Sequence, residues 1–248
     1  MIVLIRGKMV AALLAAAAIL AGCALSRPSS PPVVVQAPGT AAMDLAWHAA
    51  RFRFEWPEGA EPAWHRDLML AHRVVGPVLA ARQDRIPLWR FHRRAVRDAT
   101  GHQFSFVFYA DVATATEIMD ALRTDALLAT LQNKGIVTSI HFSDPRKSQQ
   151  PAVADTADKQ WSPAVQRTWP YFIMGASRMW LGLIEAAASG KDKDLSTNYN
   201  GLDALYRQAD AEVTAAWRRE ERHALLHHLN ALFGYEPLEV WEMNLMRF

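Results

Sequence analysis

Residues 88–109 contain the pattern that most constrains the fold. Residues 88–96 (LWRFHRRAV) and residues 102–109 (HQFSFVFY) alternate between apolar and polar side chains. The residues between them include Asp-Ala-Thr-Gly, a composition typical of a tight turn. A period of two places successive side chains on opposite faces of a strand. The pattern therefore predicts a β-hairpin with one phenylalanine-rich face and one basic face.

Two further strands and two helices are predicted around this hairpin. Residues 50–56 (ARFRFEW) alternate in the same way, and residues 136–142 (IVTSIHF) form another short apolar segment. Apolar residues recur at helical spacing over residues 62–82 and 114–134. Within the first helix, Gly76-Pro77 is expected to cause a kink, because proline removes a backbone donor.

The order of these elements is strand, helix, strand, strand, helix, strand. This order resembles the split βαβ arrangement of ferredoxin-like folds. The resemblance covers residues 47–142 and implies an α+β, βαββαβ sandwich. It implies no activity, because many unrelated functions use this fold.

The last third of the chain is expected to be helical. Residues 143–162 are polar, contain prolines and predict a loop. Helical spacing over residues 163–188 and 202–233 predicts a hairpin of two helices packed on the core, within a C-terminal region spanning 163–248. Arg178 and nearby small residues interrupt the apolar run of the first of these helices. We therefore expect a buried helix there and not a membrane span.

The N-terminal residues carry a different kind of signal. Arg6 and Lys8 precede an apolar run that ends in Leu20-Ala21-Gly22-Cys23. This resembles a bacterial lipoprotein signal peptide with its lipobox. The resemblance implies cleavage of residues 1–22 and attachment of diacylglycerol and palmitate to Cys23. A transmembrane anchor fits less well, because the apolar run is shorter than the roughly 20 residues that a span needs.

The resemblance also implies a location. Ala24 stands where lipoproteins retained at the inner membrane carry Asp, so the expected location is the outer membrane, facing the periplasm. Residues 23–46 then hold the acylated Cys23 and a flexible spacer rich in proline and small polar residues. The expected partner is the lipid bilayer, through the acyl chains of Cys23, together with an unidentified envelope protein.

Charge and cysteine content exclude several function classes. The formal net charge is +2, and Arg6 and Lys8 leave with the signal, so the rest is close to neutral. A nucleic-acid partner is not expected, because no basic stripe dominates the chain. Cys23 is the only cysteine, and its lipidation excludes both a disulfide and thiol catalysis.

The basic face of the predicted sheet is the first candidate site. Arginine forks bind carboxylate and phosphate groups through paired hydrogen bonds. An anion-binding site on this face is one interpretation, and a solvated or covered face is the other. The proposed anion-binding residues are Arg51, Arg53, Arg90, His92 and Arg94.

Histidines on the predicted helices give two further candidates. His223 and His227 are four residues apart, and Glu220 precedes them on the same helical face, which is a spacing compatible with metal ligands. His65 and His72, seven residues apart, share a face of the first helix, and a catalytic dyad is one interpretation of this pair. Without ligands from other elements, polar surface or core histidines are the simpler interpretation, and neither a metal nor a cofactor is expected.

The sequence therefore indicates a membrane-anchored envelope lipoprotein that binds or scaffolds a partner without catalysis. The alternative is a periplasmic metal- or anionic-ligand-binding protein, or an enzyme, that uses the basic face or the His223/His227 helix.

Overall fold

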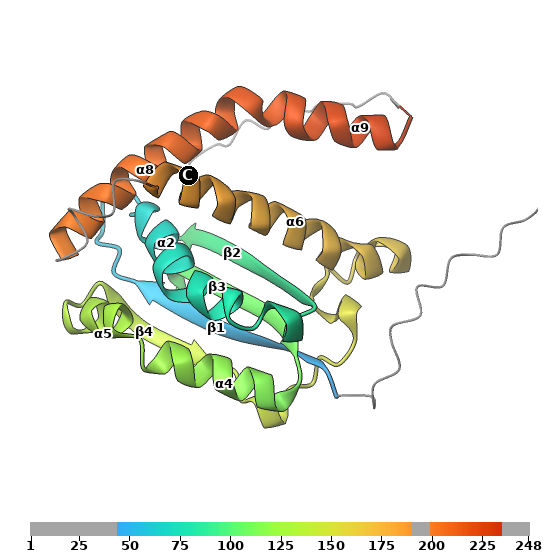
Figure 1. Ribbon diagram of the computed structural model, residues 1–248, viewed down its shortest axis with the longest axis horizontal. Helices are drawn as coiled ribbons and strands as arrows, with labels where there is room; N and C mark the ends of the chain where they lie inside the picture. The colour runs from blue at the N-terminus through green and yellow to red at the C-terminus, as the bar shows by residue number, and fades with distance from the viewer. Residues whose placement is uncertain (1–43, 190–198, 235–248) are drawn as a thin grey trace, which may run out of the picture. The chain divides into compact units, whose positions relative to one another are not determined.

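The computed structural model describes residues 44–189 and 199–234, in which helices pack around a single sheet (Figure 1). The strands are β1 (Ala46–Phe54), β2 (Leu88–Val96), β3 (Gly101–Ala110) and β4 (Val137–Phe142). The α-helices are α2 (His65–Met69), α3 (Gly76–Ala80), α4 (Val112–Arg123), α5 (Ala126–Asn133), α6 (Pro163–Ala188), α8 (Tyr199–Glu221) and α9 (His228–Leu232). Two π-helical segments, η1 (Leu70–Val75) and η5 (Arg222–His227), and three short 3₁₀ turns, η2 (Gln83–Arg85), η3 (Pro145–Lys147) and η4 (Val153–Thr156), complete the order. The predicted α+β organisation is confirmed.

The sheet is antiparallel, with the strand order β2-β3-β1-β4. Its register places Phe52 opposite Phe104 and Phe91 opposite Phe106. Alternation in each strand therefore brings the phenylalanines of three strands onto one side. We call this side the apolar face; it carries Phe52, Phe54, Phe91, Phe104, Phe106 and Phe108. The opposite side is the basic face, with Arg51, Arg53, Arg90, His92 and Arg94.

The predicted β2–β3 hairpin is confirmed. Oδ1 of Asp98 accepts hydrogen bonds from the backbone N–H groups of Thr100 and Gly101, at 2.9 and 3.0 Å. Gly101 has a φ of +67°, a conformation that costs a residue without a β-carbon little. The Asp-Ala-Thr-Gly sequence therefore closes the turn through local hydrogen bonds.

Strand β1 begins earlier than the predicted residues 50–56. Residues 46–50 are all buried, so both faces of the sheet are covered there and no alternation appears in the sequence. The cover on the basic side comes from residues 150–153. The indole Nε1 of Trp47 donates to the carbonyl of Ala152 at 3.1 Å, and the Trp47 backbone N–H donates to Gln150 at 3.0 Å.

The first predicted helix contains a π-helical turn where a kink was expected. Residues of η1 connect α2 to α3, and the backbone N–H of Gly76 donates to the carbonyl of Ala71. A β-carbon on Gly76 would lie 3.2 Å from that oxygen, so glycine allows this close approach. Pro77, which lacks an N–H, follows at the start of α3, where no donor is needed.

The predicted helix over residues 114–134 is in fact two helices, α4 and α5. The side chain of Asp125 accepts a hydrogen bond from the backbone N–H of Leu128 at 2.8 Å and so begins a new helix. Gly135 follows α5 with a φ of +70°, as expected for a glycine that ends a helix. Figure 1 shows α2, α4 and α5 on the same side of the sheet, where Leu68 and Ile118 contribute to the core of the apolar face.

Helix α6 has the predicted bounds, but it is not the buried helix that we expected, because only Pro170, Ser177, Ile184 and Ala188 are buried in it. It covers the free edge of β2. The backbone N–H of Phe91 donates to Oγ of Ser177 at 3.1 Å, and the Trp180 ring packs edge-on against Phe91. An edge strand whose donors face a helix is protected from pairing with another chain. Helix α8 contacts both α2 and α6. The predicted helix over residues 202–233 is divided into α8, η5 and α9.

Candidate functional site

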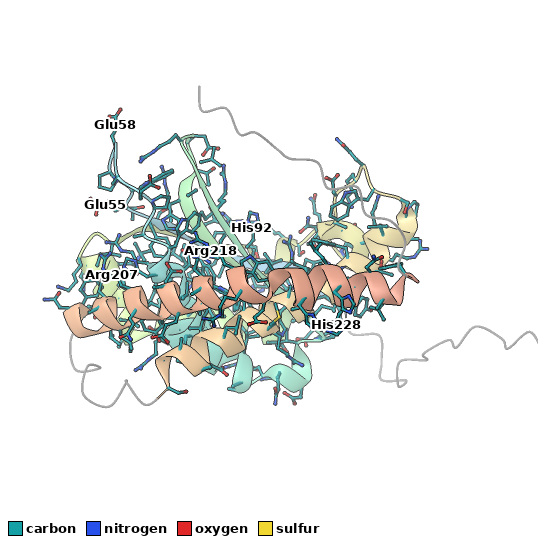
Figure 2. The ribbon with its side chains drawn as sticks, turned by 90° about the horizontal axis from the view of Figure 1, so that it is seen from above. Glu55, Glu58, His92, Arg207, Arg218 and His228 are labelled. Atoms are coloured by element: carbon teal, nitrogen blue, oxygen red, sulfur yellow. The ribbon has the colours of Figure 1, made fainter. Side chains whose placement is uncertain are left out.

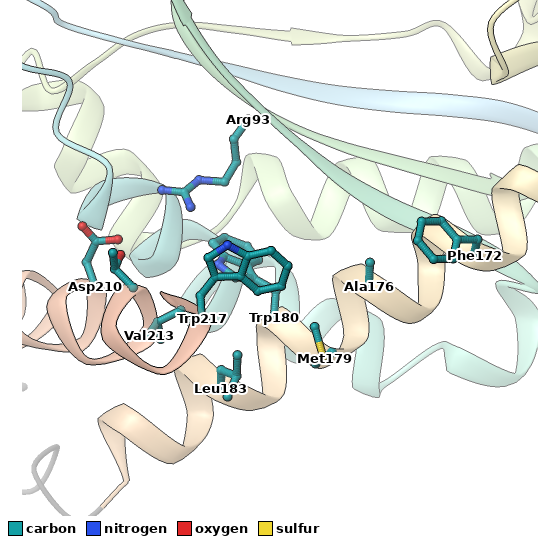
Figure 3. Close-up of a pocket in the computed structure, with 10 residues that line it drawn as sticks. Arg93, Phe172, Ala176, Met179, Trp180, Leu183, Asp210, Val213 and Trp217 are labelled. Carbon is teal, nitrogen blue, oxygen red and sulfur yellow. The ribbon is translucent and has the colours of Figure 1, made fainter. Parts of the chain in front are cut away.

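A cleft of about 420 Å³ lies between α6 and α8, beside strand β2 (Figure 3). Phe172, Met179 and Trp217 line it and keep 41%, 39% and 40% of their surfaces exposed. Large apolar side chains left in water along a concave surface are typical of ligand sites. The full lining is Arg93, Phe172, Ala176, Met179, Trp180, Leu183, Asp210, Val213, Thr214 and Trp217.

Arg93 provides the positive charge at one end of the cleft. It lies on the apolar face of β2, because its register partner is Phe104. The guanidinium carbon lies 4.9 Å from the ring centres of both Trp64 and Trp180. Nη2 donates to the Trp64 carbonyl at 3.0 Å, and Nε donates to Oδ2 of Asp67 at 2.7 Å. These contacts hold the guanidinium in one position.

Asp67 neutralises that charge from below the cleft. It has no solvent exposure, and its second oxygen lies 3.0 Å from Nε2 of His102. His102 is equally buried, between the rings of Phe54 and Trp64. The Asp67 carboxylate therefore connects α2 to β2 and β3, and both of its oxygens have partners.

Asp210 of α8 is the second charged group of the cleft. Within residues 44–189 and 199–234, the structure gives its carboxylate no hydrogen bond and no ion pair. Burial raises the pKa of Asp210, the nearby Asp67 raises it further, and Arg93 and His65 oppose the rise. Figure 3 shows the Asp210 carboxylate and the Arg93 guanidinium facing each other across one end of the cleft, far from Phe172.

A second polar cluster fixes α8 against α2. Oδ1 of Asp203 lies 2.9 Å from Nε2 of His65 and accepts a hydrogen bond from the Tyr199 hydroxyl at 2.8 Å. Burial, together with this hydrogen bond, raises the pKa of Tyr199 to about 12. Nδ1 of His72 lies 2.7 Å from the hydroxyl of Tyr206. His65 and His72 thus have separate partners on α8, which is a packing role and not a shared catalytic one.

The sequence-predicted anion-binding residues do share the basic face, but they do not meet the cleft. Arg51, Arg53 and His92 are exposed, and Arg94 donates to Asp98 at 2.6 Å. Burial lowers the pKa of His92, and the charges of Arg90 and Arg94 lower it further.

Arg90 lies at the covered end of the basic face. Its Nη2 donates to the Thr156 carbonyl at 3.5 Å, and its buried Nε has no partner in the structure. Beside it, Trp47, Leu88 and Tyr109 form a small apolar cluster with Val153. Residues 148–156 provide this cover together with Met174 of α6, which packs against the same cluster.

The predicted metal candidates lie on η5 and the helices next to it, away from the cleft. The rings of His223 and His227 stack at 5.2 Å, and Nε2 of His223 lies 3.1 Å from Nε2 of His228. Glu220 is exposed on the last turn of α8. Among the described residues, no group of three or more His, Cys, Asp or Glu side chains is arranged to hold a metal ion.

Sequence reasoning missed both charged residues of the cleft. In residues 92–94, a histidine and two arginines are adjacent, so the charge of Arg93 interrupts the alternation, although its position is in phase with Phe91 on the apolar face. From the sequence alone, Asp210 resembles an ordinary surface acid on a polar helix. The sequence does contain one signal for Arg93. A cation at a position that the alternation assigns to the core needs a buried acid as its partner, and Asp67 is the acid within the predicted first helix.

No family model, curated protein or solved structure matches this chain. None of the helices in the described ranges has both the length and the apolarity to span a bilayer. The predicted signal peptide, Cys23 and most of the predicted spacer lie outside the described residues.

Proposed function

We propose that this chain is a lipid-anchored protein of the cell envelope that binds an amphipathic ligand, without catalysis, in the cleft between α6 and α8. The ligand's apolar part lies along Phe172, Met179 and Trp217. Its head is a positively charged group that pairs with Asp210. The cleft carries this proposal, because it combines an apolar lining, a size of about 420 Å³ and a few converging polar groups.

The proposed sign of the head group follows from charge matching within the cleft. Arg93 has a direct partner in Asp67, so its charge is already balanced. Asp210 has none among the described side chains, and its burial disfavours the ionised form. A cationic head group of the ligand provides Asp210 with a partner and stabilises its ionised form. Arg218 of α8 lies at the outer rim of the same end, where its side chain is exposed (Figure 2).

A fluorescence titration tests whether the cleft is the binding site. Decylammonium serves as the probe, and the tryptophans that line the cleft report on it. Ala176 lies in the cleft wall, so Ala176→Phe should fill the space and abolish the spectral change. Ala164→Phe places the same ring on an exposed position of α6 and serves as the control. Equal responses of both variants would contradict the proposal.

The membrane anchor is proposed from the lipobox resemblance of Leu20-Ala21-Gly22-Cys23. Each buried methylene of an acyl chain contributes on the order of 0.8 kcal/mol, so several chains hold the protein on the bilayer. Ala24 supports the outer membrane as the location. Mass spectrometry of protein from its native membrane should find a mature chain that begins at an acylated Cys23. An unmodified thiol or a retained Met1 would contradict the anchor.

We also propose the ferredoxin-like topology for residues 47–142. Two observations support it: the chain order of strands and helices, and a sheet order in which β1 and β3 are the central strands. The proposal concerns the fold only and carries no activity.

A further inference from the structure

We infer that the basic face of the sheet is a second binding surface, which docks onto the anionic head groups of a phospholipid bilayer. This surface is separate from the cleft, because the two lie on opposite sides of strand β2. The choice of a bilayer as the partner rests on the proposed lipid anchor. The binding chemistry rests on the side chains of the sheet alone.

The register arranges the basic side chains in two rows across the sheet. In one row, Ser105 lies between Arg51 and His92. In the next row, Gln103 lies between Arg53 and Arg94. Neighbouring strands are about 4.8 Å apart, so the two outer groups of each row stand about 10 Å apart. Each row therefore presents two basic groups with a neutral polar side chain between them.

The charges of this surface are only partly compensated. Asp98 pairs with Arg94, and Nη1 of Arg51 lies 3.5 Å from Nδ1 of His141. The side chain of Arg53 has no hydrogen bond or ion pair in the part of the chain that the structure describes. The His92 ring has none there either, but its lowered pKa leaves it mostly neutral at pH 7, so the arginines carry the positive charge of this surface. Gln103 Nε2 donates to Oγ of Ser105 at 3.0 Å, and Ser105 itself is buried, so the exposed arginine side chains are the groups that can reach a phosphate oxygen. The surface therefore favours anions.

The exposure of the surface favours an extended anionic partner. Arg51, Arg53, His92 and His141 are all exposed on an open sheet face. Cations about 10 Å apart on an open face match many head groups side by side better than one small anion. A tether from Cys23 to Ala46 can span at most about 80 Å. The tether therefore allows the basic face to come within about 8 Å of the bilayer. This distance is the Debye length, within which a charged membrane attracts arginine.

Vesicle flotation tests this inference on the whole chain carrying Cys23→Ser, so that no acyl chain contributes. The probes are vesicles of phosphatidylcholine alone and vesicles with an equal amount of phosphatidylglycerol. Binding is expected only to the anionic vesicles. Because one arginine near an anionic surface contributes about fivefold to binding, Arg51→Gln/Arg53→Gln should weaken it about 25-fold. Arg167→Gln/Arg219→Gln removes the same charge from exposed positions of α6 and α8 and should have a much smaller effect.

Several results would overturn the inference. They are equal losses in the two double variants, equal binding to both kinds of vesicle, or displacement by inorganic phosphate at an ionic strength where sodium chloride has no effect. Tighter binding to a short oligonucleotide would replace the bilayer with a nucleic acid as the partner. Decylammonium binding by Arg51→Gln/Arg53→Gln should stay unchanged. A failure of this inference is therefore distinguishable from a failure of the proposed cleft.

Discussion

Arg93 and Asp67 form an ion pair of 2.7 Å that joins strand β2 to helix α2 beneath the cleft. The Asp67 side chain has no solvent exposure, whereas 27% of the Arg93 side chain remains accessible. A buried carboxylate of this kind is stable only because it has charged or donating partners on both oxygens. The pair therefore positions the cleft and also removes its net positive charge.

We predict that Asp67→Asn destabilises the fold by about 3 kcal/mol, because it leaves Arg93 without its counter-charge and His102 without a carboxylate partner. Chemical denaturation followed by circular dichroism measures this change. Asp84→Asn removes an exposed carboxylate from η2 and should change the free energy of unfolding by less than about 0.5 kcal/mol. If the two variants unfold alike, Asp67 does not have the proposed role.

The bond between α6 and β2 gives a second prediction. Ser177→Ala removes the oxygen that accepts the Phe91 N–H and leaves a buried donor unsatisfied, at a cost of about 1–3 kcal/mol. Hydrogen exchange should then be faster at the amide of Phe91 than in the unmodified protein. Ser189→Ala, near the exposed end of the same helix, is the control. Unchanged protection at Phe91 would argue against this contact.

Two glycines should respond to alanine in opposite directions. Gly101 has a φ of +67°, so Gly101→Ala is expected to destabilise the hairpin by about 1–2 kcal/mol. Gly175 lies within α6 with open space at its β-carbon position, so Gly175→Ala should stabilise the protein by about 0.5–1 kcal/mol. Thermal unfolding of both variants checks the signs. The same sign for both would show that backbone conformation does not decide these effects.

Stability should fall as the pH is lowered from neutrality. Burial lowers the pKa of His48 and of His65 from 6.5 in the folded state, although hydrogen bonds to Ala110 and Asp203 oppose this. Below that value the unfolded chain binds protons that the folded chain does not, which favours unfolding. Each histidine contributes up to about 1.4 kcal/mol per pH unit between 6.5 and its lowered pKa.

Urea denaturation at a series of pH values between about 5 and 8 measures this dependence. The unfolding free energy should be nearly constant at the upper end of the range and should decrease below 6.5. His65→Gln should have a smaller slope, because one of the histidines with a lowered pKa is then absent. A stability that rises on acidification would contradict the assigned directions.

The β2–β3 hairpin, helix α6 and the end of α5 at Gly135 could be predicted because local chemistry decides them. Each of these features depends on residues that are close together in the sequence: the alternation of the strands, the hydrogen bonds of Asp98 in the turn, and the glycine that ends α5. The start of β1 and the break between α4 and α5 could not be placed as well. In β1, residues 150–153, which are distant in the sequence, cover Trp47. Both faces of the strand are therefore buried there, and apolar and polar residues do not alternate. At Asp125, one side-chain hydrogen bond divides a continuous apolar pattern.

The cleft could not be predicted because it depends on how three elements meet. Nothing local to Arg93 or Asp210 shows that β2 and α8 bring them to the same end of a cavity. The basic face was accessible to sequence reasoning, since strand periodicity alone sorts Arg51 and Arg53 to one side. Sequence reasoning could not decide which residues cover this face. Residues 148–156 and Met174 of α6 cover it at one end only.

The central claim is that Asp210 selects a positively charged, apolar ligand. Calorimetric titration of the whole chain with decylammonium, decanol and decanoate tests it most directly. We expect one decylammonium per chain and weaker binding of the other two probes. Asp210→Asn should weaken decylammonium binding by about tenfold or more, as for the loss of a charged hydrogen bond, and should leave decanol binding unchanged. Equal decylammonium affinities of both proteins, or tighter binding of decanoate by the unmodified chain, would contradict the claim.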